Sequence, residues 1–233
     1  MISEQLNPSD ISRVRRRSRL VMLLDAAERA AITPLASPRL HALAYLADVL
    51  SPVWGLPAFD GKILKIDGGP HYPDLQEELD HLVVMGLVEI SNLDYVGRGP
   101  DDVGARLEGC YALDFGSPRL ADLLAALGAE PLRRPLDLED ANVHGFLVEL
   151  AGALATLSDE ELNRATSSDV TYRSEGLGEN VIDFAAWTKN PWAANPSWRT
   201  AERFEQFLPD QAHLTSGEKL FLYANYLGRA VNG

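Results

Sequence analysis

The sequence predicts a mostly helical α+β fold, and three observations support this. Apolar residues recur at helical spacing in the longer segments, as Leu20, Leu23, Leu24 and Ala27 illustrate. Alternating or β-branched stretches such as 62–66 are few and short. Proline and glycine fall mainly where helices begin and end. A chain of 233 residues is long enough to bury a substantial core, so we expect helices with small β elements around them.

The first half predicts the order helix, helix, strand, helix, strand, long tip, strand. The expected helices cover 17–31, 37–50 and 73–85, and the expected strands cover 62–66, 87–90 and 109–113. Gly86 stands where a helix C-cap belongs, and 92–107 is rich in glycine and charge. This order is typical of a winged helix-turn-helix domain, in which the third helix is the recognition helix and the tip is the wing.

The second half predicts further helices around one irregular segment. The helices are expected over 118–127, 139–157, 158–165, 200–207 and 219–231, and the irregular segment over 166–197. Within it, 181–184 fits either a short strand or a helical turn. Because 128–135 has the composition of a linker, three parts are expected: a flexible basic arm over 1–16, a winged helix-turn-helix domain over 17–128 and a helical C-terminal domain over 136–233.

The charge is uneven along the chain. Acidic residues number 34 and basic ones 21, for a formal net charge of −13. Residues 1–20 hold five arginines and two acids, a local balance of +3 that leaves −16 for the rest. The acidic body argues against a protein that coats nucleic acid over its whole surface. The sequence has no secretory signal, no apolar stretch of bilayer length and a single cysteine, so we expect a cytoplasmic protein. We expect that cysteine, Cys110, to be buried.

The search for catalytic chemistry is negative. The sequence holds no phosphate-binding P-loop, zinc-protease helix motif, nucleophile elbow or dinucleotide fingerprint. We therefore predict no enzyme activity, no catalytic residue, no metal site and no cofactor. Glu77, Glu78, Asp80 and His81 could form a metal or acid–base site, but a solvated charged face is favoured. Residues 68–70 could hold a phosphate before a helix, but a tight turn is favoured.

Two groups of residues are candidates for binding. The first could grip a phosphate backbone or an acidic protein surface, or could belong to a solvated terminus; it comprises Arg13, Arg15, Arg16, Arg17 and Arg19. We place them as the nucleic-acid-binding residues. The second is the aromatic set Trp187, Trp192 and Trp198, which could anchor a partner or staple a long loop to the core. We place it as the partner-binding set.

Several stretches resemble one protein family. They are 19–27, 40–47, 50–52, 62–65, 69–73, 79–88, 166–172 and 218–223. This text resembles the middle component of bacterial ABC-three-component systems, which are Lamassu-like conflict or antiphage defence operons. The resemblance implies a non-enzymatic winged-helix adaptor whose partners are an ABC- or SMC-type ATPase and an effector encoded nearby. It also allows contact with double-stranded DNA through the N-terminal arm. We expect no membrane partner.

Two alternatives remain open on the sequence. A DNA-binding transcriptional regulator needs basic side chains on the third helix, where the chain has Glu77, Glu78 and Asp80 instead. An antitoxin-like domain is also compatible with the Leu-Ala-Tyr-Leu-Ala helix at 43–47. Genes on either side would separate this alternative from the adaptor.

Overall fold

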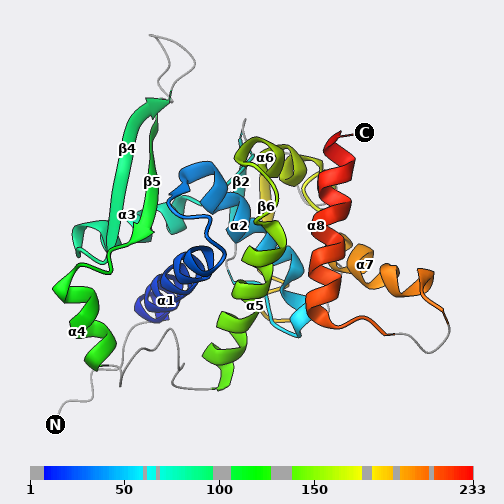
Figure 1. Ribbon diagram of the computed structural model, residues 1–233, viewed down its shortest axis with the longest axis horizontal. Helices are drawn as coiled ribbons and strands as arrows, with labels where there is room; N and C mark the ends of the chain where they lie inside the picture. The colour runs from blue at the N-terminus through cyan, green and yellow to red at the C-terminus, as the bar shows by residue number, and fades with distance from the viewer. Residues whose placement is uncertain are drawn as a thin grey trace.

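The computed structural model is mostly helical, with two small antiparallel sheets, which confirms the expected fold class (Figure 1). It describes residues 8–59, 62–66, 69–96, 106–126, 138–174, 180–190, 195–209 and 213–232. The helices are α1 (Pro8–Arg29), α2 (Ser37–Leu50), α3 (Pro73–Val84), α4 (Pro118–Ala126), α5 (Leu138–Leu154), α6 (Asp159–Ser168), α7 (Pro196–Arg203) and α8 (Ser216–Asn232), with 3₁₀ turns η1 (Ser51–Trp54) and η3 (Phe204–Phe207). The strands are β1 (Leu35–Ala36), β2 (Lys62–Ile66), β3 (Gly69–His71), β4 (Val88–Val96), β5 (Arg106–Leu113) and β6 (Val181–Asp183).

The first helix differs from the expectation. A flexible arm was expected over 1–16, but α1 begins at Pro8, so the arginines lie on a helix. Arginine is a good helix former, and proline suits a first helical position. Arg13 and Arg17 are one turn apart and both bind Glu78 of α3, so a long-range contact holds the N-terminal part of α1. Residues 1–7 lie outside the described part of the chain.

Helix α2 lies at the centre of the molecule. Every residue of α2 except Pro38 is buried. Its apolar residues lie on every side of the helix, which suits a position inside a core. Pro38 occupies the start of the helix, and Ser51–Pro52 ends it in η1, which closes at Gly55 with φ of +72°. The predicted helix over 37–50 is confirmed.

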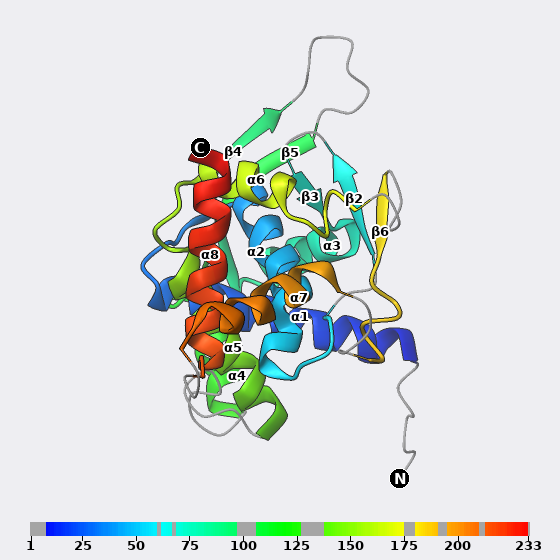
Figure 2. The same cartoon turned by 90° about the vertical axis from the view of Figure 1, so that its right-hand side faces the viewer.

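The first sheet has the strand order β1-β5-β4, with Leu35 and Ile90 both facing Tyr111 across the ladder. Strands β4 and β5 form a ribbon that projects from the helices in both views (Figures 1 and 2). Both strands run further than the predicted 87–90 and 109–113, with a register shift between Ser91 and Asp94. Of the predicted tip, 97–105 lies outside the described residues.

The second sheet joins the two halves of the chain. Its order is β3-β2-β6, and Ile63 of β2 faces Ile182 of β6. The segment left open between strand and turn is therefore a strand over 181–183. Gly69 and Pro70 belong to β3 rather than to a turn that leads straight into α3, which corrects the expected turn at these two positions.

Residues from both predicted domains form one hydrophobic core. Leu24 and Leu43 from the first half and Phe146 and Tyr223 from the second belong to the same buried cluster. Helix α5 packs along α1, and α6 packs on α2. The predicted linker over 128–135 lies outside the described residues. Within the described residues, the two halves are therefore packed together.

A buried carboxylate binds four segments to one another. Asp169, fully buried after α6, accepts hydrogen bonds from the hydroxyls of Tyr45 on α2 and Tyr223 on α8. Ser197 at the start of α7 donates to it at 2.7 Å, and the backbone N–H of Thr171 donates at 2.9 Å. Burial, together with the neighbouring carboxylate, raises the pKa of Tyr45 and of Tyr223, so both hydroxyls remain protonated donors.

The remaining helices begin at identifiable caps. Ser158 and Glu161 form the predicted capping box of α6. Asn195 caps α7 by accepting from the backbone N–H of Trp198, so this helix begins earlier than the predicted residue 200. No helix in the described ranges has the length and hydrophobicity required to cross a bilayer.

The Asp169 cluster leads to a stability prediction. Tyr223→Phe removes one donor from a buried carboxylate, and we expect it to lower the free energy of unfolding by roughly 1.5–3 kcal/mol. Tyr226→Phe, on the exposed side of the same helix, is the matched control and should change it by less than about 0.5 kcal/mol. Urea denaturation measures both changes, provided that the m-value stays the same. Equal effects of the two variants would contradict this role of Asp169.

Candidate interaction site on helix α3

Helix α3 has a buried apolar face and an exposed acidic one. Leu75, Leu79 and Leu82 are buried on the core side. The outer side carries the exposed Asp74, Glu77 and Asp80, which we call the acidic face. The helix sequence contains no lysine or arginine. At its C-terminal end Val84 and Met85 are exposed, and Gly86 turns the chain at φ of +69°.

Glu78 departs from the expected solvated face. Its side chain is only 2% exposed, and α1 supplies its counter-charges. The Nε of Arg13 donates to one carboxylate oxygen at 2.7 Å, and the Nε of Arg17 donates to the other. Glu78 is thus a buried link between α1 and α3 and not a solvated acid, because charged groups leave water only when they are paired.

Other arginines of α1 also make contacts within the molecule. Arg16 pairs with Asp74 at 3.3 Å, and Arg13 also reaches Glu77 at 3.5 Å. The guanidinium of Arg19 donates to the backbone carbonyl of Phe59 and lies over the Phe59 ring, 4.4 Å from its centroid. The acids of α3 therefore offset part of the positive charge of the α1 arginines.

The five arginines therefore divide into two groups. Arg13, Arg16, Arg17 and Arg19 contact α3 or the 59 region, whereas Arg15 is exposed. Their assignment as nucleic-acid-binding residues stays a prediction. The structure adds that four of them already bind acceptors of this chain, so gripping phosphates would require them to exchange partners.

The pairing with α1 sets the charge state of Glu78. Burial alone would raise the pKa of Glu78, but the hydrogen bonds and charges of Arg13 and Arg17 outweigh it and hold the pKa below its ordinary value. The carboxylate is therefore ionised at neutral pH and keeps both guanidiniums in place.

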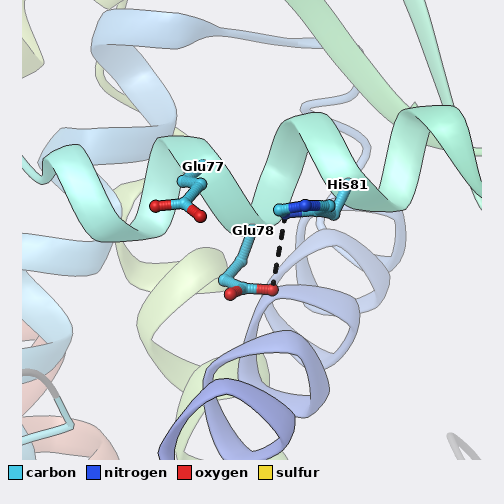
Figure 3. Close-up of side chains that lie close together, drawn as sticks. All are labelled: Glu77, Glu78 and His81. Carbon is cyan, nitrogen blue, oxygen red and sulfur yellow. Dashed lines mark ion pairs between the residues drawn. The ribbon is translucent and has the colours of Figure 1, made fainter. Parts of the chain in front are cut away.

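Glu77, Glu78 and His81 lie close together on α3 (Figure 3). Each offers one ligand atom, and these atoms lie within 4.8 Å of one another. His81 Nδ1 is 3.9 Å from Glu78. Both oxygens of Glu78, however, already accept from arginines, and two guanidiniums beside the cluster repel a further cation. We assign no metal to this cluster.

The tryptophans predicted to bind a partner are placed differently from one another. Trp187 is 4% exposed, stacks on Phe184 with ring centroids 5.0 Å apart, and its backbone carbonyl accepts from Ala58. It staples its loop to the core, which was the alternative stated for this set. Trp198 is half-buried against the core on α7, and Trp192 lies outside the described residues. Cys110, expected to be buried, is half-buried in β5.

No family model, curated protein or solved structure matches this chain.

The α1–α3 pairing leads to a pH-dependent prediction. Because the pKa of Glu78 is lowered in the folded protein, ionised Glu78 stabilises the fold above about pH 4.5, and this contribution is lost as the pH falls through the folded-state pKa. We expect Glu78→Gln to lower the free energy of unfolding by roughly 1.5–3 kcal/mol at pH 7.

The difference between Glu78→Gln and wild type should shrink in acid. Denaturant titrations from about pH 7 to 3 measure it. Glu77→Gln is the neighbouring control; its side chain is 64% exposed, so the change should stay under about 0.5 kcal/mol. A Glu78→Gln deficit that persists unchanged at the acid end would refute the assignment.

Proposed function

We propose that this protein is a non-enzymatic winged-helix adaptor subunit that binds an ABC- or SMC-type ATPase and couples it to an effector in bacterial antiphage defence. The family part of this proposal rests on the sequence resemblance to middle components of ABC-three-component systems. The structural part rests on the topology of the first half and on the charge of α3. A cytoplasmic location is part of the same proposal.

The topology supports the winged-helix part. Helices α1 and α2 flank β1, α3 precedes the β4–β5 ribbon, and β1 pairs with β5 in the order β1-β5-β4. In a winged helix-turn-helix domain this arrangement makes α3 the recognition helix and the β4–β5 ribbon the wing. The long connection through β2 and β3, which pairs with β6 of the second half, is an addition to that arrangement.

The acidic face of α3 is the observation that favours a protein partner over duplex DNA. A recognition helix enters the major groove between two rows of phosphates, and duplex DNA carries one negative charge per roughly 1.7 Å of its axis. Asp74, Glu77 and Asp80 would be repelled there. Opposite charge on a protein partner is attracted, and the exposed Val84 and Met85 add apolar area at the end of the same helix.

The arginines of α1 strengthen this argument. In a DNA-binding protein they would supply the phosphate contacts that α3 lacks. Arg13, Arg16 and Arg17 instead bind acids of α3, and so hold the acidic helix in place. These pairs also offset part of the charge of Asp74 and Glu77, so a basic protein segment on α3 would compete with Arg16 and Arg13 for these carboxylates.

The test is a binding experiment with the ATPase encoded beside the gene for this chain. We expect the immobilised protein to retain that ATPase, with retention falling as salt rises from roughly 50 to 200 mM, since charged rims respond to ionic strength. Asp74→Lys/Glu77→Lys should weaken binding about tenfold or more. Glu149→Lys/Glu160→Lys makes the same charge change on exposed acids of α5 and α6 and should leave binding unchanged.

Two outcomes would overturn the proposal. One is no retention of the neighbouring ATPase by the folded wild-type chain. The other is tight, strongly salt-dependent binding of duplex DNA that survives without the ATPase, which would favour the transcriptional regulator.

A further inference from the structure

A cavity of about 330 Å³ is lined by residues of both sheets and by the helices α2 and α3. The segments that line it, around β2, β3, α3 and β5, gather in one region of the molecule (Figure 2). Its volume falls in the range of about 300–1,000 Å³ that small-molecule sites occupy. Of the three residues of the acidic face, Asp80 also lines this cavity.

A chain of hydrogen bonds with a fixed direction runs along one wall. The backbone N–H of Tyr72 donates to Nδ1 of His41 at 3.3 Å, which leaves the ring proton on Nε2. That nitrogen lies 3.1 Å from Oε1 of Gln76, so it donates to the amide oxygen. The amide nitrogen of Gln76 then donates its two hydrogens, one to Asp80 at 2.9 Å and one to the hydroxyl of Tyr111 at 3.1 Å.

The chain ends in one donor and one acceptor side by side. The Tyr111 oxygen accepts from Gln76, and its own hydrogen finds no acceptor among the described residues, although the side chain is only 2% exposed. A buried donor without an acceptor is costly, so it marks a place where a ligand atom gains affinity. Asp80, held by the same amide, has acceptor capacity left because a carboxylate offers about four lone-pair sites.

The rest of the lining sets the shape and charge of a ligand. Ile66, Pro70 and Ile90 supply apolar walls, and the His71 ring lies 4.6 Å from the His41 ring. Two carboxylates, Asp80 and Glu108, line the cavity, and none of its described lining residues is a lysine or arginine. The lining therefore combines apolar contact area with negative charge, which disfavours a phosphate group.

From these features we propose that the cavity binds a neutral planar heterocycle that carries a ring N–H beside a carbonyl, as guanine does. The carbonyl accepts from Tyr111, and the ring N–H with its neighbouring amino group donates to Asp80. The ligand is a free base or nucleoside, since the two carboxylates oppose a phosphate group. This site lies beyond the adaptor proposal and does not depend on it.

Calorimetric titration of the purified chain with guanosine tests the site. We expect saturable binding, weaker binding of GMP, and binding of adenosine weaker by about tenfold or more because adenine has no ring N–H to give. Tyr111→Phe should weaken guanosine binding roughly tenfold by removing the donor, and Asp80→Asn at least as much by removing a charged acceptor.

Matched controls separate the site from general effects. Glu77→Gln removes a carboxylate of α3 that does not line the cavity, and Tyr226→Phe removes a distant hydroxyl; both should bind guanosine like wild type. The comparison of guanosine, GMP and adenosine uses the wild-type chain, so it tests the site even where a variant is unstable. No guanosine binding up to about 1 mM, equal binding of adenosine, or preference for GMP or a guanine-containing oligonucleotide would overturn the proposal. Loss of ATPase binding would leave these results untouched.

Discussion

The architecture depends on the cost of burying the Asp169 carboxylate. Within the described residues no cation pairs with it, so hydroxyl and backbone donors must replace its water. Those donors come from α2, from the turn after α6, from the start of α7 and from α8, which fixes the C-terminal half against the central helix. Asp48 on α2 is a second buried carboxylate, and it accepts from the Tyr72 hydroxyl at 2.6 Å and from the backbone N–H of Phe59. Tyr72 directly precedes α3, so Asp48 also helps to position the helix that carries the acidic face.

Much of the fold follows from local sequence, and the remainder depends on contacts between distant residues. Helices α2 and α3 and the capping box at Ser158 are encoded by neighbours a few residues apart, and the sequence predicts them. The start of α1 has local signals in Pro8 and the arginines, but the contact that holds it depends on a partner of Arg13 that lies 65 residues away. The pairing of β6 with β2 and the two-residue β1 are likewise decided by strands elsewhere in the chain.

The sequence shows the acids of α3, which were expected to form a solvated face, but it does not show how they pair. Glu77 and Glu78 are the same residue type side by side, yet their side chains are 64% and 2% exposed. Helical spacing could have predicted the burial of Glu78. It follows Leu75 by three residues and precedes Leu82 by four, so it lies on the buried face. Arg13 and Arg17, four residues apart, show the complementary stripe. Trp187 had no such signal, because its burial depends on Phe184 within an irregular segment and on Ala58 in a distant one.

Asp80 links the two proposed sites physically. It belongs to the acidic face that we propose for a basic protein partner. It also lines the cavity, where its carboxylate accepts a hydrogen bond from the amide of Gln76. A ligand that donates hydrogen bonds to this carboxylate competes for the charge that attracts the partner. Where two ligands contact the same carboxylate, any coupling between them has the same free energy in both directions. If both proposals hold, a neutral heterocycle in the cavity would therefore tune the affinity of α3 for its partner, and the partner would tune the affinity of the cavity by the same factor.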